Sequence, residues 1–119
     1  MINPNLRNPF GYITGPHYVY VIGTWVGSEI VPIYVGRGRG DRAKNYFRVR
    51  GNYLLPKTHN PGLNMKMAEI RKRGQELTIN AEDFGSSLFG AKQREKELIA
   101  KHGRIDKGTG TLFNRNSGG

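Results

Sequence analysis

The stretch from His17 to Arg42 holds the residue types that could bind an anion. Two tyrosine-bearing apolar segments lie in it, and the second runs directly into a glycine-rich cluster of arginines. A guanidinium is always protonated, and its fork of N–H groups matches two oxygens of a phosphate. The basic residues between positions 37 and 50 are Arg37, Arg39, Arg42, Lys44, Arg48 and Arg50, against the single acid Asp41. This composition predicts a polyanionic partner.

Glu95 is the acidic residue whose position most needs a chemical explanation. A helix expected over about residues 86–102 carries apolar side chains at intervals of three and four, and Glu95 falls inside that stripe. An ionised carboxylate on a core-facing stripe is costly unless it meets an arginine, a hydrogen-bond network or a metal ion. Glu97 lies outside the stripe and is interpreted as a solvated partner of a neighbouring lysine.

Composition narrows the classes of function. The 119 residues suffice for one domain, and 19 Lys and Arg against nine Asp and Glu leave a net charge of +10, which is typical of nucleic-acid binding proteins. A basic protein without such a partner is the alternative on charge alone. Cysteine is absent, which excludes disulfides and thiolate metal sites. Without a signal-like or membrane-spanning run, we expect an intracellular, cytoplasmic protein that is not secreted and does not engage membranes.

The tyrosine segments predict an antiparallel hairpin. The run from His17 to Ile22 alternates, so that Tyr18, Tyr20 and Ile22 share one strand face, and residues 30–36 form the returning strand after a longer loop at 23–29. Pro32 cannot donate to a central ladder, so the second strand should lie at a sheet edge or carry a bulge. The first strand is then expected to be central.

The remaining chain predicts further elements of an α/β (α+β) domain. Residues 1–16 form an irregular arm, a helix capped by Asp41 begins at about Arg42, and 51–61 form a loop. A helix ending at Gly74, a strand over about 76–82 and the 86–102 helix follow. The apolar residues expected on these two helices are Leu63, Met65, Met67 and Ile70, and then Leu88, Ala91, Leu98 and Ile99. Leu112 and Phe113 are expected to hold Asn114 against the domain.

Four motifs in order resemble the GIY-YIG nuclease family. YVY at 18–20 and YVG at 34–36 look like its paired signature, and YVGRGRGDRA resembles the branch written YVGKGxGxR. EKELI at 95–99 is similar to the ExxLI helix motif, and GTGTLFNRNSGG from Gly108 is similar to the closing GxGxLxNxTxGG. The resemblance covers about residues 17–119 and implies a single domain with a three-stranded antiparallel sheet flanked by helices.

The resemblance also implies metal-dependent hydrolysis of DNA, by nicking or double-strand cleavage. By motif position, Tyr20 and Tyr34 would flank the attacking water, and Glu95 would bind one Mg²⁺ or Mn²⁺ ion. Arg42 would hold the scissile phosphate, with Tyr46 beside it, and Asn114 would complete the site. Nucleic-acid contacts are expected from Arg37, Arg39, Lys44 and Arg48.

The residues leave alternatives open. Arg37 replaces a lysine and cannot release its proton, so the base would be Tyr20 or a metal-bound hydroxide. Nearby arginines and a bound cation are expected to favour a tyrosinate, which predicts a rate that rises at alkaline pH. Glu95 could instead pair with Arg42, and a non-catalytic basic nucleic-acid-binding module is the competing function. RNA is a further possible substrate, and a dimer or partner protein could supply specificity.

Overall fold

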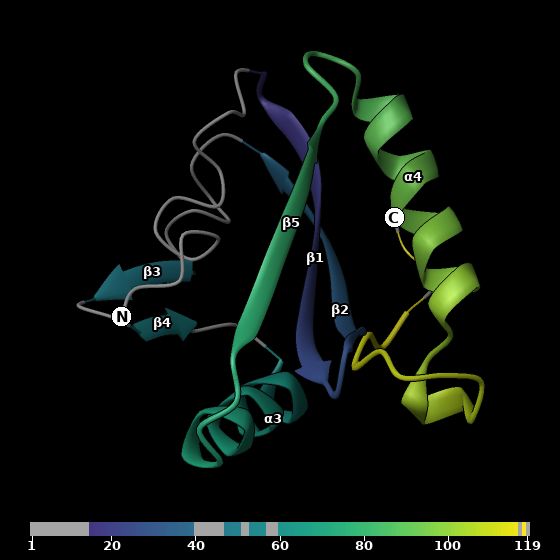
Figure 1. The fold of residues 1–119 in the computed structure, drawn as a ribbon. Coiled ribbons are helices and arrows are strands. Elements are labelled where there is room, and N and C mark those ends of the chain that lie inside the picture. The colour runs from purple at the N-terminus through teal and green to yellow at the C-terminus, as the bar shows by residue number, and fades with distance from the viewer. Residues whose placement is uncertain (1–14, 40–46, 51–52, 57–59, 117, 119) are drawn as a thin grey trace.

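The computed structural model describes residues 15–39, 47–50, 53–56, 60–116 and 118. Its centre is a three-stranded antiparallel sheet of order β2-β1-β5, with two long helices beside it, so the fold is α+β as expected (Figure 1). The sheet strands are β1 (His17–Val26), β2 (Glu29–Arg39) and β5 (Leu77–Asp83); the helices are α3 (Pro61–Lys72) and α4 (Leu88–His102). The smaller elements are β3 (Phe47–Arg50), β4 (Tyr53–Pro56) and the 3₁₀ turn η1 (Ile105–Lys107).

The hairpin forms with β1 in the centre and β2 at the edge, as the sequence predicts. The ladder shifts register between Ile22 and Gly23, where Pro32 enters opposite Gly23. A bulge accommodates proline because it removes the need for its missing N–H at that point. The expected longer loop at 23–29 is wrong, because the strands continue to Val26 and resume at Glu29, with Gly27 at a φ of 62° in the turn. Only glycine adopts that φ readily.

The two faces of the sheet carry separate cores. Tyr18, Tyr20 and Ile22 lie on the face packed against α3, and Val19 and Val21 lie on the face packed against α4. The α3 core is completed by Ile33, Leu63, Met67, Ile70, Leu77, Ile79 and Ala81, and the α4 core by Val35, Ala91, Leu98, Ile99 and Leu112. Strand alternation therefore assigns residues 18–22 of β1 alternately to the α3 face and the α4 face.

Helix α3 begins with a side-chain cap. The Oδ1 atom of Asn60 accepts a hydrogen bond from Leu63 N at 3.1 Å, and Pro61 occupies the first helical position, where its missing N–H is not needed. The buried stripe is Leu63, Met67 and Ile70. Met65, which was expected in that stripe, is 75% exposed. Its position two residues from Leu63 and from Met67 turns it away from a stripe spaced at three and four.

Helix α4 is capped by Ser87, whose hydroxyl accepts from Gly90 N at 3.0 Å. Ala91, Leu98 and Ile99 are buried, but Leu88, expected in the same stripe, is 42% exposed because it lies in the first turn beyond the covered part of the sheet. Glu97 pairs with Arg94 at 3.4 Å rather than with a lysine. No helix in the part of the chain that the structure describes is both long and apolar enough to cross a membrane.

The segment between β2 and α3 departs from expectation. The interpretation of residues 51–61 as loop is wrong in part, because Tyr53–Pro56 forms β4 and pairs antiparallel with β3. The leucines at 54 and 55 form a short apolar run that periodicity could not assign. The helix predicted from about Arg42 and the arm at residues 1–14 lie outside the described residues.

Candidate active site

Tyr20 and Tyr34 meet on the α3 face of the sheet. Tyr20 lies opposite Gly36 in the β1–β2 ladder, and Tyr34 lies opposite Ile22 on the same face. Their ring centroids are 6.3 Å apart and the rings are tilted by 41°. This is the spacing of a diagonal cross-strand aromatic pair. Tyr20 is buried and Tyr34 is half-buried, so Tyr34 is the more accessible of the two phenols.

The glycines of β2 make room for tyrosine rings of β1. A Cβ atom placed on Gly36 would lie 2.3 Å from Cζ of Tyr20. One placed on Gly38 would lie 2.1 Å from Cε2 of Tyr18. Each ring therefore lies across the bare backbone of its partner position. The ring of Tyr18 occupies the space left by Gly38 of the neighbouring strand.

Glu95 is half-buried on α4, between the buried residues Ala91 and Leu98 of the sheet-facing stripe. The helix presents it there because it follows Ala91 by four residues and precedes Leu98 by three. Its negative charge acts on Tyr34, since the carboxylate is one of two causes that raise the pKa of Tyr34. Residues 34 and 95 belong to separate elements, yet the charge of Glu95 affects the pKa of Tyr34.

The pKa of Tyr34 is raised from its ordinary value of 10.0, first by burial and then by the charge of Glu95. Both causes disfavour the phenolate. The direction is opposite to the expected stabilisation of a tyrosinate, which would require a cation. In the chain itself, Tyr34 is a neutral phenol that can donate one hydrogen bond and accept others at neutral pH.

Asn114 lies at the free edge of β2, beside this tyrosine. Its Nδ2 donates to Val35 O at 2.7 Å and its Oδ1 accepts from Val35 N at 3.0 Å. Phe113 N donates to Ile33 O at 2.7 Å, so the C-terminal segment continues along the same edge. Asn114 therefore holds the strand residue that follows Tyr34, which is a positioning role.

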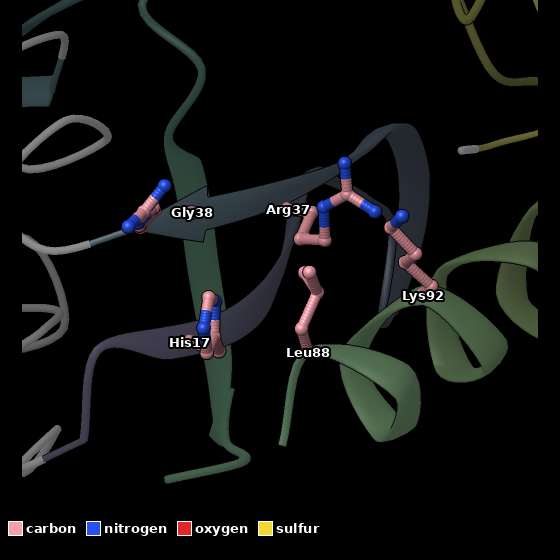
Figure 2. A pocket seen from close by; sticks show the side chains of 6 residues that line it. His17, Arg37, Gly38, Leu88 and Lys92 are labelled. Atoms are coloured by element: carbon pink, nitrogen blue, oxygen red, sulfur yellow. The ribbon is translucent and has the colours of Figure 1, made fainter. Parts of the chain in front are cut away.

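The arginines of the glycine-rich cluster divide between described and undescribed parts of the chain. Arg37 and Arg39 alternate with the two glycines and lie on the α4 face of the ladder, and they line a cavity of about 220 Å³ with Lys92. Figure 2 shows Arg37 and Lys92 at this cavity. The tyrosines point to the other face. Arg42, Lys44 and Tyr46 lie outside the described residues, and Arg48 belongs to β3, of whose side chains nothing is described. The sequence assigned no role to Lys92 or to His17, which lines the same cavity.

The donor set suits a largely hydrated ion. Among the described residues, no three His, Cys, Asp or Glu side chains gather as a metal cluster. Glu95 offers a single hard oxygen ligand, and Mg²⁺ commonly keeps several waters and binds through one or two carboxylates. The residues therefore fit one ion held by Glu95, and they do not fit a protein cage.

No protein-family model matches the sequence, and searches of curated proteins and of solved structures each find no match.

Proposed function

We propose that this protein is a metal-dependent endonuclease of the GIY-YIG type that hydrolyses a DNA phosphodiester. The observations that support the proposal are the pairing of Tyr20 with Tyr34 across two strands and the effect of the Glu95 charge, from a distant helix, on the pKa of Tyr34. Two phenols and one carboxylate beside a basic strand end are groups that phosphodiester hydrolysis uses. The four ordered motifs of the sequence add to this support.

The chain's own groups divide the work. Tyr34, neutral and half-buried, orients the attacking water through hydrogen bonds, and Tyr20 on the neighbouring strand is the candidate to accept a proton. A divalent ion bound at Glu95 would neutralise charge on the phosphoryl oxygens and offset the carboxylate that raises the pKa of Tyr34. Asn114 keeps Tyr34 in position through the backbone of Val35. Arg42 is proposed to bind the scissile phosphate.

The competing function is a nucleic-acid-binding module without hydrolysis. It is favoured by the basic cavity at Arg37, Arg39 and Lys92, which needs no metal to attract phosphate. Glu95 argues for the enzyme, because a carboxylate beside a phosphate-binding surface weakens simple binding. The two functions therefore differ in what loss of Glu95 does.

The test is cleavage of supercoiled plasmid by the wild-type protein, by Glu95→Gln and by Glu97→Gln, each with Mg²⁺, Mn²⁺ or EDTA. Glu97 lies on the same helix, is exposed and pairs with Arg94, so its variant makes the same chemical change away from the tyrosines. DNA binding by each protein is measured in EDTA alongside. Branched and single-stranded substrates are included, since the preferred DNA structure is not specified by the motif residues.

The proposal expects metal-dependent nicking or linearisation by the wild-type protein and by Glu97→Gln. It expects loss of cleavage, with DNA binding retained or strengthened, in Glu95→Gln. Binding without cleavage by any of the three proteins on all substrates would contradict it and favour the binding module. Equal cleavage by wild type and Glu95→Gln would remove the carboxylate from the reaction.

A further inference from the structure

A small cavity opens between the ends of β1 and β2 and the first turns of α4. It has a volume of about 220 Å³, and the residues that line it are His17, Arg37, Gly38, Arg39, Leu88 and Lys92. Figure 2 shows the guanidinium of Arg37 extending toward α4, with the side-chain amine of Lys92 beside it. Three cationic side chains, Arg37, Arg39 and Lys92, thus line one cavity. Among the described residues that line it, none is acidic.

Two polar atoms of the residues that line this cavity have no hydrogen-bond partner. In the part of the chain that the structure describes, Nδ1 of His17 and Nη1 of Arg37 are buried without one. A buried unpaired donor costs about 1–3 kcal/mol, so native proteins rarely keep one without a reason. An anion accepting a hydrogen bond from Nη1 of Arg37 would remove that cost, and Nδ1 of His17 can donate to the same anion when it carries the imidazole proton. The same anion would also screen the repulsion between Arg37 and Lys92.

The cavity is separate from the tyrosine pair. Arg37 lies opposite Val19 and Arg39 lies opposite His17 in the ladder, so these side chains share the α4 face. Tyr20 and Tyr34 point to the α3 face. Arg37 is therefore directed away from the tyrosine pair. Its charge is directed into the cavity instead.

Lys92 connects the cavity to Glu95. The two residues are three apart on α4, and side chains at that spacing are neighbours on one side of a helix. A strand of nucleic acid with one phosphate near Glu95 can thus place another phosphate beside Lys92. The cations of the cavity come from α4 (Lys92) and from the end of β2 (Arg37 and Arg39).

We propose that this cavity binds a phosphate of the nucleic-acid backbone other than the one hydrolysed, with Lys92, Arg37 and Arg39 as its ligands. The inference rests on the proposed function for its nucleic-acid partner, but it requires binding and no hydrolysis. Such a contact fixes the register of the strand and carries no sequence information. Lys92 and His17 become members of the nucleic-acid interface.

The experiment measures binding of a short DNA duplex of fixed sequence in EDTA over a range of salt concentrations. Lys92→Gln is compared with Lys92→Arg and with Lys101→Gln, an equally exposed lysine at the far end of the same helix. The magnitude of the slope of log K against log salt should fall by about one in Lys92→Gln. It should stay at the wild-type value in Lys92→Arg and Lys101→Gln. Both substituted side chains, Lys92 and Lys101, are exposed lysines, so folding is expected to survive and is checked by circular dichroism.

A second readout locates the effect. The ring resonances of His17 should shift on addition of the duplex, and this shift should shrink in Lys92→Gln. Equal slopes for Lys92→Gln and Lys101→Gln would overturn the proposal, as would a lowered slope with unmoved His17 resonances. Plasmid left uncut by the wild-type protein, with the Lys92 effect present, would defeat the endonuclease and leave this phosphate site standing. Plasmid cleavage by the wild-type protein, with equal salt slopes for Lys92→Gln and Lys101→Gln, would support the endonuclease and defeat this phosphate site.

Discussion

The side chain of Asn114 hydrogen-bonds to both backbone polar groups of Val35, with Nδ2 donating at 2.7 Å and Oδ1 accepting at 3.0 Å. It thereby imitates a neighbouring strand at the open edge of β2. Thr111 Oγ1 donates to Pro32 O at 2.7 Å along the same edge. The C-terminal segment covers backbone groups that would otherwise template pairing with another chain.

Replacement of Asn114 by alanine should destabilise the fold. Both backbone groups of Val35 would lose their partner in a buried place, and each unsatisfied group costs about 1–3 kcal/mol. We expect the free energy of unfolding, measured by urea denaturation, to fall by about 2 kcal/mol or more. The amide of Val35 should exchange its hydrogen faster.

Asn116→Ala is the matched control, because the hydrogen bond described for the Asn116 side chain, in which Oδ1 accepts from Gly118 N at 3.0 Å, is exposed. Its effect should stay within about 0.5 kcal/mol. If Asn114→Ala abolished cleavage with unchanged stability and unchanged Val35 exchange, Asn114 would act in the reaction directly and the positioning role would be wrong.

Gly38→Ala should also be strongly destabilising. The new methyl group would lie 2.1 Å from the ring of Tyr18, which is fully buried and has no space to retreat. Overpacking of this kind costs about 1–3 kcal/mol. Thermal unfolding monitored by circular dichroism measures the loss.

Gly62→Ala provides the comparison, because its Cβ would meet only ordinary contacts at 3.6 Å within helix α3. Alanine is the better helix former, so this change should be neutral or slightly stabilising. In a double-mutant cycle, Tyr18→Gly should destabilise the Gly38→Ala variant less than it destabilises the wild type. Simple additivity would mean that ring and glycine do not contact each other.

The pH dependence of stability should carry the signature of Tyr34. Burial, and then the charge of Glu95, raise the pKa of Tyr34 above 10.0, so the folded protein keeps this proton where the unfolded chain releases it. The resulting stability is fully present below pH 10 and is lost as pH rises through the folded-state pKa. The unfolding free energy of the wild type minus that of Tyr34→Phe should therefore be constant below pH 10 and should fall as the pH rises above it.

Ultraviolet titration of the phenolates tests the cause. The titration step missing from Tyr34→Phe is that of Tyr34. In Glu95→Gln the midpoint of this step should move down, yet remain above 10.0, because burial is the larger cause. If the midpoint of Tyr34 were the same in Glu95→Gln as in the wild type, the carboxylate would not act on this phenol.

Asn60 joins helix α3 to the C-terminal segment, so its replacement by alanine should remove a hydrogen bond from each of them. Its Oδ1 caps the helix at Leu63 N, and its Nδ2 donates to Phe113 O at 2.8 Å. Ser87→Ala removes only the single cap bond of α4 and should cost about 0.5–2 kcal/mol. Asn60→Ala should cost more than Ser87→Ala in chemical denaturation. Asn60→Ser, which keeps a cap but is too short for Phe113, should fall between wild type and alanine.

The sequence determined which side each strand residue faces. Alternation in β1 separates Tyr18, Tyr20 and Ile22 from Val19 and Val21, and the structure places these sets in different cores. Pro32 predicted an edge strand or a bulge, and β2 has both properties. These results are local, because period and backbone chemistry act within a few residues.

The spacing of apolar residues predicted burial incorrectly where the packing of neighbouring elements decides which side chains are covered. Met65 and Leu88 are as apolar as their buried neighbours, yet both are exposed, Met65 because it is turned away from the buried stripe of α3 and Leu88 because it lies in the first turn of α4 at an open cavity. The run containing β4 was too short to show a period, and only its pairing with β3 makes it a strand.

Tertiary structure alone decided the site's membership. Asn114 reaches Val35 across 79 positions, and Lys92 reaches the cavity of Arg37 from another element. The sequence indicated that Arg37 and Tyr34 belong to one motif, but strand alternation and packing of α4 send their side chains to opposite faces. Proximity between distant segments arises from the packing of whole elements, so spacing along the chain could nominate these residues but could not say which of them meet.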